Sequence, residues 1–151
     1  MTEANGNQPI LQLVYTSRAA SRFTDDALLN LLKRARRHNA ATGVTGVLMV
    51  HDDLFAQCLE GPEAAVRELF GRIERDGRHY GVTVMLEQFS GARTFPEWSM
   101  GCTRLTNSET LQLSTARWEE LERRHLETGT CAPGFVLLQT LWDDHKQTAA
   151  V

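Results

Sequence analysis

Phe55-Ala56-Gln57-Cys58-Leu59-Glu60-Gly61, followed at once by Pro62, is the stretch from which the fold can be predicted. Alternate residues of a β-strand face the same side, so Gln57 would lie between Phe55 and Leu59 on one face. Two large apolar neighbours indicate that this face is buried. A buried amide without partners costs about 1–3 kcal/mol. An isolated case would be a core glutamine satisfied by backbone or water, but here the rest of the chain supplies candidate partners.

The composition is that of an ordinary globular protein, and it argues against several classes of function. Of 151 residues, 42% are hydrophobic and 23% charged, which fits one domain with one core. A net charge of −3 gives no electrostatic footprint for nucleic acid, and the basic run over 33–37 is expected to be a solvated helix end. No apolar run approaches the ~18 residues of a membrane span. Three cysteines and five histidines show neither a disulfide framework nor metal-ligand spacing, so a reducing cytoplasm and no bound metal are expected.

Hydrophobic periodicity and turn residues predict strands and helices in a definite order. The first strand is apolar on both faces, which is typical of the centre of a sheet. Thr24 is the expected N-cap of the first helix and Asn39 its expected C-cap, while His51-Asp52-Asp53 predicts a hairpin turn. The expected elements are a strand over 10–16, a helix from Thr24 to His38-Asn39, strands over 44–50 and 55–61, a helix from Pro62 to 76–77, and strands over 82–86 and 98–100, the last with Trp98 and Met100 on one face.

This order is the split β-α-β-β-α-β pattern of ferredoxin-like α+β folds with an added fifth strand. In that topology the first and third strands lie side by side, so Tyr15 and Gln57 are expected to be neighbours near the sheet centre. Both helices would cover one face of the sheet, and a flat ligand could lie between them. The predicted boundaries are a disordered lead over 1–9, a domain over 10–105, a helical cap over 106–146 and a tail over 147–151.

Beyond residue 105 the sequence predicts further helices that pack on the other face of the sheet. Asn107 and Ser108 could cap a short helix, and 116–126 reads as another, with Trp118 facing inward. The final helix, from Phe135 to Trp142, is apolar over more than one stripe. It would either cover the exposed sheet face or be shared with a second chain, and on the second reading a homo-oligomer is expected.

Six short motifs in this order resemble the BLUF domains, a family of blue-light sensors that use a flavin, over roughly residues 11–105. Any one of them is weak, but the six together are specific. They are Tyr15-Thr16-Ser17, His38-Asn39, Thr42-Gly43-Val44-Thr45-Gly46-Val47-Leu48, the 57–61 stretch, Asp76-Gly77-Arg78-His79, and Arg93 with Phe95, Trp98, Ser99, Met100 and Gly101.

The resemblance implies a flavin between the two helices, FAD in the first instance, with FMN or riboflavin as alternatives. Asn39 would bind the C4 carbonyl and N3 edge of the ring, Arg78 the C2 carbonyl side, and Gln57 would bridge the Tyr15 hydroxyl and the N5/O4 edge. Trp98 and Met100 would lie beside Gln57 as part of the photoactive set. The remaining residues implied in flavin binding are His38, Arg72, Ile73, Asp76 and His79.

The resemblance also implies a photoreaction rather than enzyme catalysis. Excited flavin would take an electron from Tyr15, with the proton following through Gln57, whose amide would be left rotated or tautomerised and newly hydrogen-bonded to the C4 carbonyl. A glutamine suits this role because its amide presents a donor and an acceptor at the end of one reorientable chain. The altered bond would then signal to a downstream protein.

Three alternatives remain at this level. The first is a flavin-binding redox or scaffold module that does not respond to light, and the second is an interaction module without a cofactor. The third is a ferredoxin-like acyl-phosphate hydrolase, which is disfavoured because no anion-cradling glycine loop precedes a helix. A cysteine adduct of the flavin is disfavoured too, since Cys58 alternates to the strand face opposite Gln57 and is expected to be a buried structural thiol.

Overall fold

The computed structural model describes residues 9–21, 24–104, 118–120, 122–124, 127 and 136–143. The predicted lead up to residue 8, the short helix near Asn107 and Ser108, and the tail over 147–151 lie outside these residues. The elements are β1 (Ile10–Ala19), α2 (Asp25–Thr42), β2 (Thr45–His51), β3 (Leu54–Gly61), α3 (Glu63–Glu74), β4 (His79–Ser90) and β5 (Gly101–Arg104).

The five strands form one mixed sheet in the order β4-β1-β3-β2-β5. The pairs β4–β1, β1–β3 and β3–β2 are antiparallel, and β5 joins β2 in parallel. This confirms the ferredoxin-like arrangement with a fifth strand added at one edge. It also confirms that the first and third strands are neighbours, since Tyr15 is the direct partner of Gln57.

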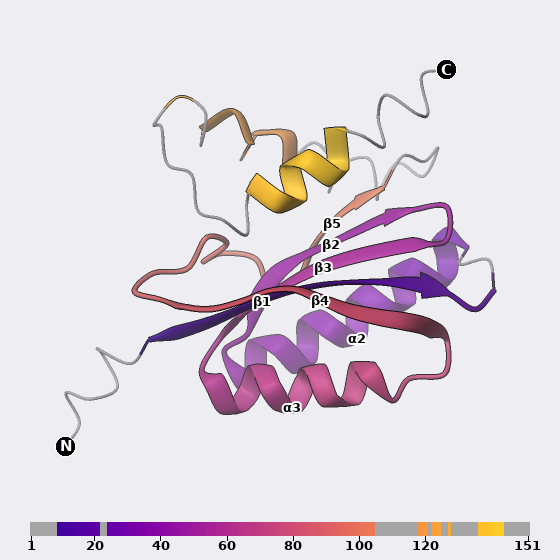
Figure 1. Cartoon of the computed structure of the whole chain (residues 1–151), viewed down its shortest axis with the longest axis horizontal. Coiled ribbons are helices and arrows are strands. Elements are labelled where there is room, and N and C mark those ends of the chain that lie inside the picture. Colours follow the sequence, from indigo (N-terminus) through magenta and orange to yellow (C-terminus); the bar gives the residue numbers. More distant parts are fainter. Residues whose placement is uncertain are drawn as a thin grey trace.

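Each face of the sheet is covered by a different part of the chain (Figure 1). Helices α2 and α3 pack on one face, where the core includes Leu13, Leu28, Leu59 and Val66. The other face carries a second core, in which strand residues such as Val47 and Cys58 meet Trp118, Leu138 and Trp142 from the C-terminal part of the chain.

The C-terminal part packs on the sheet face that the sequence predicts for it. Residues 118–120 and 136–143 are helical, and Trp118, Leu138 and Trp142 are fully buried or nearly so. The spacing of Leu138 and Trp142 is one helical turn, which places both on one side of their helix. Within the described chain, this helix therefore covers the sheet, one of the two roles that its apolar sequence allowed.

Helix α2 is one turn longer than its sequence predicts, and this moves Asn39 into the helix. The helix begins as expected, with the Thr24 hydroxyl accepting a hydrogen bond from the Ala27 backbone N–H. It ends at Thr42, and the C-cap is Gly43, with φ of 78° and its N–H donating to the Asn39 carbonyl. The prediction of Asn39 as the cap was wrong because a glycine four residues later adopts the left-handed conformation without a Cβ penalty.

The end of the sheet also differs from the prediction. Strand β4 covers His79–Ser90 instead of 82–86, and it is an edge strand whose exposed Tyr80, Val84, Met85 and Phe89 mask the alternation that marks a half-buried strand. Strand β5 begins at Gly101, after Trp98 and Met100, which lie in irregular backbone. Side chains two residues apart in irregular backbone need not point to the same face of the sheet, so Trp98 and Met100 can lie on different faces.

Candidate functional site

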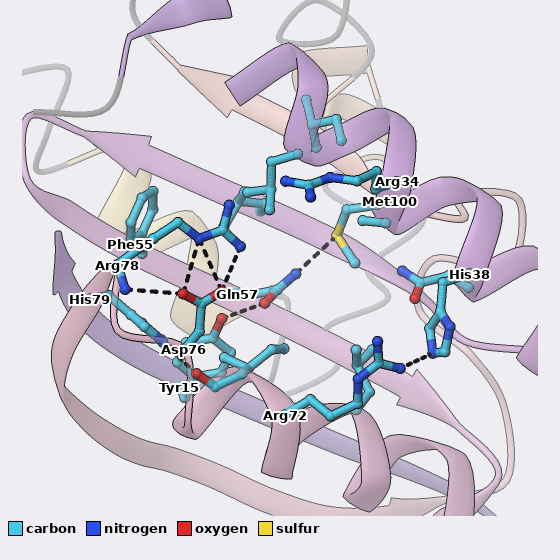
Figure 2. A pocket seen from close by; sticks show the side chains of 17 residues that line it. Tyr15, Arg34, His38, Phe55, Gln57, Arg72, Asp76, Arg78, His79 and Met100 are labelled. Atoms are coloured by element: carbon cyan, nitrogen blue, oxygen red, sulfur yellow. Dashed lines mark hydrogen bonds and ion pairs between the residues drawn. The ribbon is translucent and has the colours of Figure 1, made fainter. Parts of the chain in front are cut away.

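A cavity of about 340 Å³ lies between α2, α3 and the sheet (Figure 2). Most of its wall surface is apolar, and about half of the lining residues carry polar or charged side chains that could orient a small molecule. The lining residues are Tyr15, Leu31, Leu32, Arg34, Ala35, His38, Asn39, Leu48, Phe55, Gln57, Leu69, Arg72, Ile73, Asp76, Arg78, His79 and Met100.

The centre of the site is a relay of three side chains from β1, β3 and the segment before β5. The Tyr15 hydroxyl donates to Oε1 of Gln57 at 2.5 Å, and Nε2 of Gln57 donates to Sδ of Met100 at 3.3 Å (Figure 2). All three side chains are buried. A thioether is a weak acceptor, so the amide N–H of Gln57 can exchange this partner for a stronger one at little cost.

The phenol of Tyr15 is held protonated by its surroundings. Burial raises the pKa of Tyr15 well above its usual value, and the nearby carboxylate of Asp76 raises it further. Phe70 of α3 packs against the ring, with the centroids 5.4 Å apart. The phenol is thus a neutral hydrogen-bond donor at any physiological pH.

Asn39 presents a buried acceptor that lacks a partner within the described residues. Its Nδ2 donates to the Ser99 carbonyl at 2.7 Å, which fixes the amide in place. Its Oδ1 is buried without a hydrogen bond, and the residue lines the cavity. Because an unpaired buried carbonyl is costly, this atom is the expected contact of a ligand N–H. An aromatic ligand with donors and acceptors along one edge, such as a flavin ring, fits Asn39 and Gln57 together.

One end of the cavity is closed by the pair Asp76 and Arg78 (Figure 2). The Arg78 guanidinium contacts the carboxylate through Nε at 3.0 Å and Nη2 at 2.5 Å, and the Arg78 backbone N–H donates to Oδ1. These hydrogen bonds lower the pKa of Asp76 to about 2, against the opposing effect of burial. Because the two residues are only two positions apart in a tight turn, the Arg78 cation and the Asp76 anion are held together beside the cavity.

His38 and His79 occupy opposite sides of the cavity in the view of Figure 2. The Arg72 guanidinium donates to Nε2 of His38 at 3.4 Å, which joins α3 to α2 at the rim. His79 contacts the Ile73 carbonyl through Nε2 at 2.5 Å and Ser17 Oγ through Nδ1 at 2.8 Å. Because a carbonyl only accepts, Nε2 carries a proton, so His79 ties β1 to the end of α3. His38, Arg72, Ile73 and His79 all line the cavity, but their contact with a ligand stays a prediction.

Trp98 does not share the face of Met100, contrary to the sequence prediction. Met100 points into the cavity, whereas Trp98 belongs to the core on the other face, stacked on Phe95 with centroids 5.8 Å apart. A Cβ on Gly101 would lie 2.2 Å from Cε3 of Trp98, so the indole rests directly on that glycine. The expectation of a regular strand over 98–100 produced the error. Cys58 lies on the face opposite Gln57, as expected, and is fully buried.

Part of the α2 wall of the cavity was not predicted from the sequence. The residues that were not assigned to the site are Leu31, Leu32, Arg34 and Ala35, whereas His38 and Asn39 were. Leu31, Ala35 and His38 follow one another at helical spacing, and Arg34 and Asn39 flank them. The same spacing was available in the sequence, because all three residues lie within the predicted helix from Thr24 to His38-Asn39. The contacts of Arg36 and Asn39 with the backbone at residues 99 and 100 left no sequence signal, because the partners are about 60 residues away.

Other classes of site find no support in the described residues. No group of three or more His, Cys, Asp or Glu side chains in this part of the chain is arranged to hold a metal ion. Among the helices that are described, none is long and apolar enough to cross a membrane.

A family model described as sensors of blue-light using FAD, abbreviated BLUF, matches residues 10–101. Among curated proteins, the β subunit of a photoactivated adenylate cyclase from Euglena gracilis is 36% identical over 98 residues, which are 64% of this chain and 11% of that protein. The blue light- and temperature-regulated antirepressor BluF of Escherichia coli K12 is 32% identical over 88 residues, 58% of this chain and 22% of its own length. The chain thus spans between a tenth and a quarter of the length of these relatives.

Solved structures extend the likeness to the whole domain. BlrB, a BLUF protein in its dark state, aligns over 94% of this chain and 96% of its own with a TM-score of 0.61 and 29% identity. BlsA in its photo-activated state aligns over 65% of this chain and 71% of its own, with a TM-score of 0.58 and 33% identity.

Proposed function

The chain belongs to the BLUF family of blue-light sensors, and we propose that it binds FAD in the cavity between α2 and α3 and reports light through Tyr15 and Gln57. The observation that carries the proposal is the 2.5 Å hydrogen bond from the Tyr15 hydroxyl to Oε1 of Gln57 inside that cavity. It sets a redox-active phenol against a reorientable amide, on two residues that are direct partners across β1 and β3.

The proposed ligand contacts follow from the donors and acceptors that line the cavity. Oδ1 of Asn39 accepts an N–H of the ring, and the free capacity of the Gln57 amide serves the adjacent edge. The Arg78 guanidinium, held by Asp76, is the cation at one end, and His38, Arg72, Ile73 and His79 complete the walls. FMN or riboflavin would make the same ring contacts.

A bound flavin supplies absorption of blue light and, once excited, an acceptor for one electron. Tyr15 gives up that electron, and its hydroxyl proton moves to Oε1 of Gln57 along the hydrogen bond that already joins them. The electron and a proton would then return to Tyr15. If the proton comes back from Oε1, the Gln57 amide would be left rotated; if Oε1 keeps that proton and Nε2 releases one instead, the side chain would be left as the other tautomer. Its contact with Sδ of Met100 changes with it, since the N–H no longer lies where the sulfur accepted it.

The proposed output is a change in the contacts of Met100 that reaches a partner protein. Met100 is continuous with β5, and its backbone carbonyl accepts a hydrogen bond from Nε of Arg36 at 2.8 Å. A rearranged side chain at this position can bias the segment before β5 between two arrangements. Related proteins are named as cyclase subunits and as an antirepressor, so the regulated partner of this chain is proposed to be a signalling protein.

An absorption spectrum before and after blue light tests the proposal. The purified protein should be yellow, with flavin bands that shift slightly to the red on illumination and return in the dark. A yellow protein whose spectrum does not respond would favour the alternative of a light-inert flavin module. A colourless protein that fails to take up added FAD, FMN or riboflavin would overturn the proposal altogether.

A further inference from the structure

Glu60 is a buried carboxylate on the face of the sheet opposite the cavity. Its side chain is fully buried, three residues along β3 from Gln57. Each oxygen accepts two hydrogen bonds: Oε2 from the Thr94 backbone N–H at 2.9 Å and from Nε2 of Gln12 at 3.1 Å, and Oε1 from the Phe95 backbone N–H and from the Thr45 hydroxyl at 3.4 Å.

These four donors suit an ionised carboxylate. Burial raises the pKa of Glu60 above its usual value, and the hydrogen bonds from Thr94, Phe95 and Gln12 and the charge of Arg93 offset only part of this increase. Arg93 contacts the Glu60 backbone carbonyl at 3.2 Å and the Thr45 hydroxyl at 2.9 Å. Two of the donors to the carboxylate are backbone N–H groups, which cannot become acceptors for a protonated carboxyl.

The segment over 94–100 connects this carboxylate to the cavity. Glu60 holds its beginning through the backbone of Thr94 and Phe95. In its middle, the Trp98 carbonyl accepts from the Gly46 N–H at 2.9 Å, and Phe95 stacks on Trp98. At its end, the Ser99 carbonyl accepts from Asn39, and the Met100 side chain accepts from Gln57. One segment thus has a polar anchor on one face of the sheet and its functional contacts on the other.

We propose that Glu60 is a positioning residue for the photoresponse, which fixes the start of the 94–100 segment and so sets how Met100 and Ser99 meet Gln57 and Asn39. The inference rests on the proposed function, because it assigns Glu60 to the response of that same site. Glu60 does not touch the cavity; it acts only through the backbone that it holds. The lifetime of the light state is the property that this anchor controls.

The variant that tests the anchor is Glu60→Gln, which keeps the shape and removes one acceptor oxygen. Each carboxylate oxygen faces one backbone N–H, so either orientation of the new amide sets an NH2 group against a backbone donor. The Glu60→Gln protein should still bind FAD and shift on illumination. Its dark return should differ from that of the wild type by about fivefold, the factor in rate that corresponds to the usual net worth of one hydrogen bond. The position of its dark flavin band should change as well.

The matched control is Val66→Ala, which weakens the core below α3 without lining the cavity. It should lower the unfolding temperature at least as much as Glu60→Gln and leave the lifetime within twofold of the wild type. Gln12→Met offers a second, milder test, because it removes one donor to Glu60 and leaves both backbone contacts in place. Gln12→Met should change the lifetime of the light state in the same direction as Glu60→Gln, but by a smaller factor. If Glu60→Gln does not fold, Gln12→Met alone tests the role of Glu60.

The outcomes separate the two proposals. If the wild type shows no light-induced shift, the proposed function fails and the role of Glu60 fails with it. Suppose that the wild type responds to light and that Glu60→Gln recovers in the dark at the wild-type rate. The role of Glu60 is then overturned, and the proposed function stands. If Glu60→Gln does not fold, the dark recovery of Gln12→Met decides in the same way. A lifetime change that Val66→Ala reproduces would also overturn it, since general loss of stability would then explain the effect.

Discussion

The hydroxyl of Tyr15 and the amide oxygen of Gln57 lie 2.5 Å apart, on residues that face each other directly across β1 and β3. The relationship is set by backbone register, because a shift of one residue in either strand would turn one of the two side chains to the other face of the sheet. The backbone positions of both residues are therefore fixed by the sheet, while the Gln57 amide can turn about its side-chain bonds if its hydrogen bonds to Tyr15 and Met100 are exchanged.

Tyr15→Phe should abolish the red shift and leave flavin bound. The substitution removes the hydroxyl that donates to Gln57 and keeps the ring that packs on Phe70. Difference spectra before and after blue light measure the outcome. Tyr80→Phe is the matched control, because the chain has two tyrosines and Tyr80 is 58% exposed on the edge strand. A full shift in Tyr15→Phe would contradict the proposed photoreaction.

Gln57→Leu should likewise bind flavin without a red shift, because leucine has neither the donor nor the acceptor of the amide. The control on the same strand is Cys58→Ala, whose side chain belongs to the other face. That variant should respond like the wild type. If Cys58→Ala were inactive and Gln57→Leu active, an adduct chemistry would replace the one proposed here.

Asn39→Ala should weaken flavin binding by about tenfold or more, the factor expected for loss of a hydrogen bond to a buried acceptor. The affinity can be measured by titrating the apoprotein with FAD and following the quenching of flavin fluorescence. Asn30→Ala on the exposed side of the same helix is the control and should bind like the wild type. Unchanged affinity in Asn39→Ala would remove Asn39 from the ligand site.

The ion pair of Asp76 and Arg78 predicts a loss of stability in acid. The pKa of Asp76 is about 2 in the folded protein, below the ordinary value of 3.8. A carboxyl with a lowered folded pKa contributes stability above its unfolded pKa, and the contribution disappears as the pH falls from about 4 to about 2. Wild type should exceed Asp76→Asn by about 1 kcal/mol at pH 6 in urea unfolding, allowing for the partial exposure of the pair. A difference that stayed constant down to pH 2 would contradict this assignment.

Gly46→Ala should destabilise the sheet by about 3 kcal/mol, at the upper end of what overpacking usually costs. A Cβ at this position would lie 1.9 Å from the Cys58 carbonyl oxygen, which belongs to the backbone of the paired strand and cannot rotate away. Gly77→Ala is the control, since a Cβ there would meet nothing within 4 Å. Thermal unfolding of the two variants in parallel measures the contrast, and equal midpoints would show that the strands can separate at Gly46 without cost.

The sequence predicted those features of the site that depend on regular alternation. Tyr15 and Gln57 were placed correctly because both lie in long strands where a period of two holds, and because the split pattern makes the strands neighbours. The predicted position of Trp98 was wrong because Trp98 does not lie in a strand. Residues 95–100 form no strand, so the chain can turn Trp98 to one face of the sheet and Met100 to the other within two residues.

Glu60 shows a second limit of prediction from sequence. Alternation correctly places it on the face opposite Gln57, but its partners lie 34 and 35 residues ahead and 48 residues behind. No local sequence pattern predicts such a hydrogen-bond network. A charged residue in a strand that is apolar apart from Gln57 was the available signal, because a buried carboxylate requires partners somewhere in the fold.

The parallel pairing of β5 with β2 has a consequence for how the protein is made. Gly101 pairs with Val47, so the ribosome must release the whole of β3, α3 and β4 before the sheet can receive its last strand. Strands β1 to β4 can form an antiparallel sheet by themselves while translation continues. The wall that Met100 provides is therefore the last to arrive, and a nascent chain should present an open, unfinished cavity until then.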